Sequence, residues 1–154
     1  DQATSGLLVV ACSADAHRLL SQKFAQNQVR KTYAAILSRP IKSSSGTVDL
    51  PLWGNPEDRP KQSVDFQRGK PSCTDFRVLS DGNCPRVEFY PRTGRTHQLR
   101  VHAADSRGLD SPILGDTLYG SREGAERMCL HAIALKFLHP FSKASLHFSS
   151  SALF

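Results

Sequence analysis

The sequence predicts an α+β fold, with a mixed, largely antiparallel sheet flanked by helices and loops. Three observations support this prediction. Short apolar runs of strand length recur along the chain, only two segments combine helical spacing with capping residues, and turn-forming residues join two of the runs directly. We find no internal repeat, and the length suits one domain, so residues 1–154 are expected to share a single core.

The first part of the chain is predicted to run strand, helix, strand. Residues 6–12 form an apolar run that is typical of a strand. Ser13 is a good helix cap, and apolar residues then recur at helical spacing as far as the polar stretch around Asn27, which predicts about four turns. A second strand is expected at 32–37, where β-branched and aromatic residues cluster.

The middle of the chain is predicted to contain one hairpin between loops. Residues 42–46 are rich in serine and indicate a loop, and residues 53–70 are rich in Pro, Gly and charge, which predicts a long surface excursion without regular elements. Strands are expected at 74–79 and 86–90. Because Asp-Gly-Asn at 81–83 suits a tight turn, the two strands should be antiparallel.

A second helix and two further strands are expected in the last third. Thr96 can cap a helix over 97–106, with Gly108 available to end it in the left-handed conformation. Strands are predicted at 129–138 and 145–148, separated by a His-Pro turn.

Composition restricts the function only broadly. The net charge of +6 and a pI near 9.4 favour a polyanionic partner, although charge alone does not identify one, and no apolar run approaches the roughly 20 residues of a membrane-spanning helix. Four widely spaced cysteines include no C-x-x-C pair, so we expect no metal site and a reducing compartment. Cys12 and Cys129 lie in apolar runs and are expected to be buried.

The most informative segment is 90–102, where a Gly-Arg turn leads into the second predicted helix among cationic and amide side chains. Such a start offers free backbone N–H groups to an anion, and phosphate would suit it. A Gly-Arg turn alone is nevertheless a weak motif, because it can equally begin an ordinary helix.

The segment from Gly94 to Arg100 resembles the Gly-Arg-x-His-Gln-Leu-Arg motif of the RluA family of pseudouridine synthases. Four further segments resemble the family in the same order: Asp1 to Leu8, Lys31 to Tyr33, Pro112 to Asp116 and Leu130 to Ala132. Residues 48–52 and 59–62 look most like the RluA branch itself, whose members modify ribosomal RNA and anticodon-loop transfer RNA.

The resemblance implies a catalytic domain with a central RNA-binding cleft that isomerises uridine to pseudouridine without a cofactor. By the family pattern, Asp1 corresponds to the nucleophile, Arg100 to its ion-pairing arginine, and Tyr33 to the tyrosine that stacks on the uracil and takes the C5 proton. Attack at the ribose and attack at the uracil ring both remain open. The branch also implies a monomer.

Recognition of a structured RNA requires the target base to leave its stack, so RNA binding and catalysis should be linked. Six residues are candidates for phosphate and loop contacts: Arg59, Lys61, Arg92, Arg95, His97 and Gln98.

Family members carry His-Arg-Leu before the nucleophile, and this segment is not in the sequence, so we expect the chain to lack its N-terminal segment. The cysteines indicate a reducing compartment, which is cytoplasmic or organellar.

Two alternative functions remain: a non-catalytic RNA-binding or ribosome-assembly factor with the synthase fold, and a small basic hydrolase. Taken alone, Asp1 would be a frayed chain end, Tyr33 a core tyrosine, and Arg100 one partner of a surface pair.

Overall fold

The structure is a computed structural model that describes residues 1–121 and 124–154. Its elements are β1 (Ser5–Gly6), α1 (Ala14–Ala25), β2 (Arg30–Ile36), β3 (Ser45–Asp49), β4 (Leu52–Trp53), the 3₁₀ turn η1 (Pro56–Asp58), β5 (Ser63–Val64), β6 (Cys73–Ser80), β7 (Arg86–Pro91), α2 (Gln98–Ala104), β8 (Leu130–Leu138) and β9 (Ser145–Ser149).

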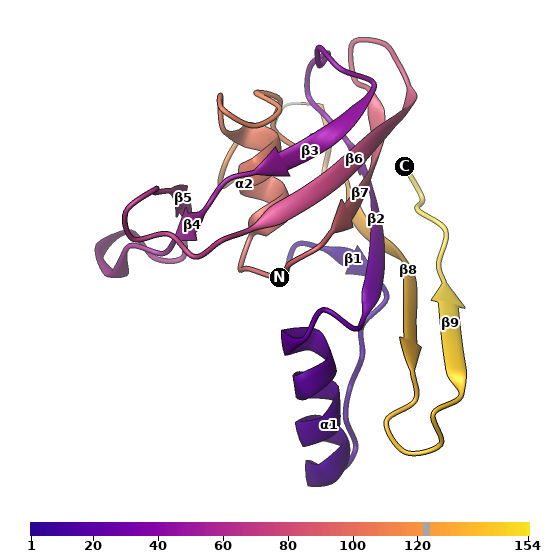
Figure 1. Cartoon of the computed structure of the whole chain (residues 1–154). Coiled ribbons are helices and arrows are strands. Elements are labelled where there is room, and N and C mark those ends of the chain that lie inside the picture. Colours follow the sequence, from indigo (N-terminus) through magenta and orange to yellow (C-terminus); the bar gives the residue numbers. More distant parts are fainter. Residues whose placement is uncertain (122–123) are drawn as a thin grey trace.

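The main sheet has seven strands in the order β1-β8-β2-β7-β6-β3, with β9 also paired to β8. Among the strands of the described residues in this sheet, β1 and β8 are parallel and the other pairs are antiparallel. Figure 1 shows β4 and β5 projecting from the sheet as a separate small ladder, at a distance from α1. The prediction of an α+β fold with a largely antiparallel sheet is therefore confirmed.

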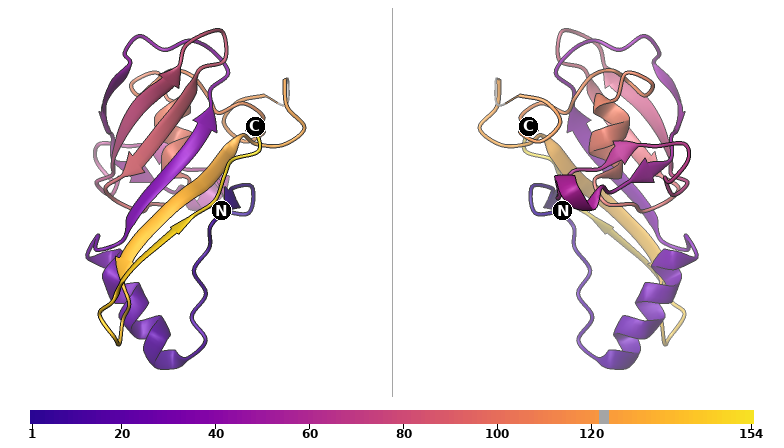
Figure 2. Two further views of the ribbon diagram at one scale, coloured as in Figure 1. Left: turned by 90° about the vertical axis from the view of Figure 1, so that its right-hand side faces the viewer. Right: turned by 90° about the vertical axis from the view of Figure 1, so that its left-hand side faces the viewer.

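The strand predicted at residues 6–12 is much shorter in the structure. β1 ends at Gly6 because the far half of β8 is already paired, with Ala134 opposite Ser149 of β9. The chain then continues to α1 as an extended segment without a ladder, alongside the sheet (Figure 2). The apolar run is explained by packing, since alternate side chains of this segment contact a core cluster.

The exposure of this segment alternates along the chain. Leu7 and Val9 pack against the cluster formed by Leu20, Val29, Leu135 and Phe137, whereas Leu8 and Val10 are 83% and 72% exposed. Cys12, predicted to be buried, is exposed, because the segment leaves the cluster before α1 begins. The prediction for Cys129 is confirmed, as it is buried beside β8.

Helix α1 begins as predicted and ends earlier. Ser13 Oγ accepts a hydrogen bond from the N–H of Ala16, and the helix closes at Ala25 after 12 residues, about three turns. Asn27 then takes a left-handed conformation with φ of 55°. Only Leu20 is buried within the helix, so α1 covers just the end of the sheet.

The middle strands agree with the sequence only in part. β6 and β7 form the predicted antiparallel hairpin, and β8 and β9 are also confirmed. β3 was missed, because the serine-rich stretch before it gives little strand signal, and it pairs with the outer edge of β6. The excursion at 53–70, predicted to lack elements, contains β5 and η1.

Helix α2 differs most from its prediction. Thr96 is not its cap: the helix is preceded by His97, in a left-handed conformation with φ of 54°, without a side-chain cap bond. It contains seven residues and ends at Ala104, before Gly108, which is not in the left-handed region. A Cβ at Gly108 would lie 2.2 Å from the carbonyl oxygen of His102, so this glycine permits close backbone approach instead.

The larger core cluster lies between α2 and the sheet. Leu99 and Ala103 of α2 pack with Val87 and Phe89 of β7, both fully buried. This packing holds the first turn of α2 against β7, and therefore fixes where the side chain of Arg100 points. Within the described residues, none of the helices is long and apolar enough to cross a membrane.

Gly6 allows β1 to approach β8, and we expect Gly6→Ala to lower the free energy of unfolding by at least about 2 kcal/mol. Its φ is 98°, and a Cβ would lie 2.4 Å from the backbone oxygen of Ala132. Gly82→Ala is the matched control, because Gly82 also has a positive φ, of 133°, with nothing within 4 Å of the added carbon. Urea unfolding of both variants measures the difference, and equal losses would contradict the close-approach explanation.

Candidate active site

An open groove of about 710 Å³ runs across the sheet where the amino-terminal segment, β2 and the loop before α2 meet. Its walls include Asp1, Tyr33, His97 and Arg100, which come from three separate parts of the chain: the amino terminus, β2 and the start of α2. A volume of this size suits a small ligand, or a single nucleotide of a longer nucleic acid. The groove brings together all three residues predicted to act in catalysis.

Asp1 and Arg100 are in direct contact in the groove. Nη1 of Arg100 lies 3.2 Å and 3.1 Å from the two carboxylate oxygens of Asp1. The side chain of Arg100 is 7% exposed and that of Asp1 is 20% exposed. The pair is thus shielded on the arginine side and open on the carboxylate side, where a substrate can approach.

A second carboxylate, Asp116, fixes the other side of the Arg100 guanidinium. Nε and Nη2 of Arg100 donate to the two oxygens of Asp116 at 2.8 Å and 2.7 Å, a bidentate arrangement. Burial alone would raise the pKa of Asp116, but hydrogen bonds from Arg100 and from the N–H groups of Leu118 and Tyr119 outweigh it and lower that pKa. Asp116 is therefore ionised and holds Arg100 in one orientation.

Tyr33 lies in the middle of β2, between Phe89 of β7 and Ala132 of β8. A register shift between Thr32 and Tyr33 interrupts the β2–β8 ladder at this point. Burial raises the pKa of the Tyr33 phenol. The phenol is therefore protonated at neutral pH, and its ring forms part of the groove wall.

Lys31, two residues earlier on β2, also lines the groove. Its Nζ donates to the carbonyl oxygen of Thr93 at 3.1 Å, and burial lowers its pKa. This bond ties β2 to the loop that precedes α2.

His97 connects the groove to Tyr119 and Gln62, which lie behind its wall. Its Nε2 is 4.0 Å from Oδ1 of Asp1, and its Nδ1 is 2.8 Å from the hydroxyl of Tyr119. That hydroxyl accepts a hydrogen bond from the backbone N–H of Gln62 at 2.8 Å. Burial, and next the positive charge of Arg100, lower the pKa of His97, so the imidazole is neutral at pH 7.

Gln98 lines the groove but is only 4% exposed, and its predicted contact with RNA stays a prediction. Oε1 accepts from the Thr93 hydroxyl and the Arg95 N–H, and Nε2 donates to the Cys73 carbonyl and the Thr74 hydroxyl. The amide is therefore fully satisfied inside the protein, where it fixes the shape of the Gly-Arg turn.

The four basic residues predicted to bind RNA are all exposed, and only one of them lines the groove. Arg95 does so, and its Nε donates to the carbonyl of Pro71. Arg92 is in an ion pair with Asp75 at 2.7 Å. Arg59 and Lys61 lie on the excursion, at and just beyond the end of η1. Their roles in binding stay a prediction.

Three residues of this site were not identified from the sequence. Asp116 belongs to a segment that resembled the family, but it lies 16 positions after Arg100 in the chain, and no local spacing reveals their contact. Lys31 belongs to the segment Lys31 to Tyr33, which also resembled the family, but no role was assigned to it. Tyr119 gives no sequence signal. His131, in the segment Leu130 to Ala132 that resembled the family, is buried and bonds to the hydroxyls of Ser5 and Ser150.

The sequence matches the RNA pseudouridylate synthase family over residues 1–105. Two similar proteins are the dual-specificity RNA pseudouridine synthases RluA of Pasteurella multocida (strain Pm70) and Escherichia coli (strain K12). They are 40% and 41% identical over 159 residues, which cover 100% of this chain and 71% of each relative.

Solved structures give the same result. Human RNA Pseudouridylate Synthase Domain Containing 1 superposes with a TM-score of 0.82 at 32% identity, and Domain Containing 4 with 0.72 at 27%. They match 98% and 91% of this chain, which spans 66% and 64% of theirs. The matched family, the similar proteins and the shared fold together place the chain among the RNA-modifying isomerases. The chain belongs to the RNA pseudouridylate synthase family, which confirms the resemblance found in the sequence.

Proposed function

We propose that this chain isomerises uridine to pseudouridine within structured RNA, with Asp1 as the nucleophile. The observation that carries the proposal is the contact between Asp1 and Arg100, in which the guanidinium is itself held by a buried carboxylate. A cation at this distance favours the ionised form of a carboxylate, and ionisation is what a nucleophile needs. The open side of Asp1 faces the groove, where a flipped uridine would lie.

The reaction breaks the bond between the uracil and the ribose and then joins the same two groups through a different atom of the ring. The N-glycosidic bond between N1 and the ribose carbon is cleaved, the uracil turns, and C5 joins the same ribose carbon. C5 then releases its proton, and N1 takes up one proton, so that the product is an isomer of the substrate. Asp1 can carry the intermediate covalently by attack at the ribose or at the uracil ring, and both routes use the same carboxylate. The ring of Tyr33 would stack on the uracil, and its phenolate, the minor form at neutral pH, would accept the C5 proton.

Tyr33→Phe separates the two roles assigned to this residue. We expect the turnover number to fall by about 10²- to 10⁴-fold, because the proton acceptor is lost, while RNA affinity is retained, because the aromatic ring remains. Since burial raises the pKa of Tyr33, the phenolate fraction grows with pH above neutrality, and the turnover number should rise with it. Single-turnover rates between about pH 7 and pH 9 measure this, and an equal pH profile in the variant would exclude the proton role.

The substrate is inferred to be a stem-loop of ribosomal RNA, transfer RNA, or both. The dual-specificity names of the relatives and the exposed Arg59, Lys61, Arg92 and Arg95 support this inference. We also infer that the protein acts as a monomer, as the RluA branch that it resembles implies. We place it in a cytoplasmic or organellar compartment that keeps its cysteines reduced. No metal is assigned to the reaction.

The test is tritium release from RNA carrying uridine labelled at C5, since isomerisation exchanges this hydrogen for solvent protons. The substrates are a transfer RNA anticodon stem-loop and a ribosomal RNA stem-loop, each compared with a form in which the loop uridines are replaced by cytidine. Release that depends on the uridine supports the proposal. Tight RNA binding without release would favour the alternative of a non-catalytic RNA-binding factor.

A further inference from the structure

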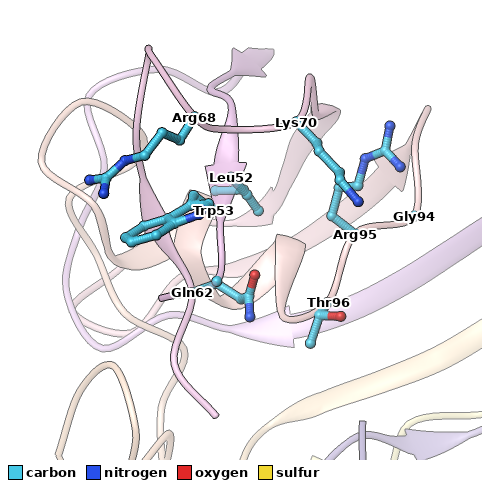
Figure 3. Close-up of a pocket in the computed structure, with 9 residues that line it drawn as sticks. Leu52, Trp53, Gln62, Arg68, Lys70, Gly94, Arg95 and Thr96 are labelled. Atoms are coloured by element: carbon cyan, nitrogen blue, oxygen red, sulfur yellow. The ribbon is translucent and has the colours of Figure 1, made fainter. Parts of the chain in front are cut away.

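A second hollow, of about 460 Å³, lies next to the catalytic groove, under the β4–β5 ladder. Gly94, Arg95 and Thr96 line both, so the two adjoin along the Gly-Arg turn. No aspartate or glutamate lines the second hollow within the described residues. Figure 3 shows Trp53 and Arg68 of the excursion on one side of it. On the other side lie Lys70, the last residue of the excursion, and the turn before α2.

One side of this hollow offers flat surfaces. The guanidinium of Arg68 lies over the ring of Trp53, 3.7 Å from the ring centroid. Asp65 orients Arg68 through its Oδ2, 2.6 Å from Nη2 and 2.8 Å from Nε. Nucleobases stack on aromatic rings and on guanidinium planes, and such stacking tolerates any base.

The other side of the hollow offers positive charge. Lys70 and Arg95 stand there, opposite Trp53 and Arg68, with the side chain of Gln62 between the two sides (Figure 3). Lysine and arginine at such a position suit a phosphodiester. A hollow with a stacking side and a cationic side matches the two halves of a nucleotide, whereas a free inorganic anion would leave the stacking side unused.

We propose that this hollow binds one nucleotide of the RNA strand adjacent to the target uridine, with its base on the Trp53–Arg68 side and its phosphate on the Lys70–Arg95 side. The proposal rests on the proposed function, because the neighbour is defined by the uridine in the groove. Arg95 would lie between the two nucleotides, since it lines both sites.

The hollow is also linked to the catalytic residues. Gln62 donates its backbone N–H to Tyr119, which contacts His97, which in turn faces Asp1. A nucleotide that orders Gln62 would therefore order the wall of the groove. RNA with a nucleotide in this hollow should then react faster than a shorter RNA, as well as bind more tightly.

Trp53 is the only tryptophan of the chain, so its fluorescence reports on this hollow directly. A five-nucleotide single-stranded RNA with uridine at its centre is titrated into the protein, and tryptophan emission and the anisotropy of a labelled copy of the RNA are followed together. We expect emission to change with the same midpoint as anisotropy. Arg68→Ala should weaken binding by about tenfold, the loss typical of one stacked base.

Lys70→Ala should lower the slope of log K against log salt by about 0.7, as expected for one phosphate contact to a single strand. Arg18→Ala is the matched control, because it removes the same charge as Arg68→Ala from the exposed surface of α1. It should leave affinity and emission unchanged.

The outcomes separate the two proposals. An emission change that persists in Asp1→Asn supports the nucleotide site whether or not tritium is released. Binding seen by anisotropy without any change in Trp53 emission, or equal weakening by Arg68→Ala and Arg18→Ala, overturns the nucleotide site and leaves the proposed isomerase reaction untouched.

Discussion

Asp1→Asn is expected to abolish isomerisation, with a loss of at least about 10⁴-fold in the single-turnover rate. Asparagine keeps the size of the side chain and removes the charge that Arg100 stabilises at 3.1 Å, so no covalent intermediate can form. RNA affinity should be unchanged or slightly tighter, because a negative charge leaves a groove that binds a polyanion. Rates are measured by tritium release at saturating RNA, and affinities by anisotropy.

Asp15→Asn is the matched control for this substitution. Asp15 makes the same kind of contact with an arginine, Arg18 at 3.8 Å, but on the exposed surface of α1. Its loss should leave the rate unaltered. If Asp1→Asn kept more than about a thousandth of the single-turnover rate of the unsubstituted protein, while Asp15→Asn kept all of it, the nucleophile would be another residue.

Arg100→Met is expected to reduce both activity and stability. The rate should fall by about 10²- to 10³-fold, because Asp1 loses its fixed cation. The free energy of unfolding should fall by about 3 to 5 kcal/mol, because the side chain of Asp116, 0% exposed, is left charged without its partner. Urea unfolding and tritium release, both under conditions where the variant remains folded, provide the two values.

A double variant distinguishes the two effects. Arg100→Met combined with Asp116→Asn removes the unpaired buried charge, so much of the lost stability should return, while the rate should not. Recovery of activity in the double variant would mean that Arg100 acts only by supporting the fold. Asp116→Asn alone should lower the rate less than Arg100→Met, since the contact of Arg100 with Asp1 remains possible.

The strands and helices predicted with most success were those whose signal is local. The β6–β7 hairpin and the start of α1 depend on a turn sequence and on one capping serine, and both were correct. The run at 6–12 failed because a strand needs a free partner edge, and β9 occupies the edge of β8 that this run would have used. Pairing of this kind is a property of distant segments, which the pattern of one segment does not contain.

The site residues likewise divide into those that a local motif identifies and those that depend on distant contacts. Asp1, Tyr33 and Arg100 could be named because ordered motifs linked them to a family, and the structure places them around one groove. Gln98 belongs to the same motif yet is buried, so a motif reports that a residue matters without saying whether it faces the substrate. Asp116 could not be assigned, because its bond to Arg100 depends on how a loop folds back over α2.

The hydroxyl of Tyr119 sets the tautomer of His97. Because this oxygen already receives the Gln62 N–H, its own proton is best donated to Nδ1 of the imidazole, which leaves the ring hydrogen on Nε2. That nitrogen is the one turned toward Asp1. The carboxylate therefore faces the fixed positive charge of Arg100 on one side and the N–H dipole of a neutral imidazole on the other.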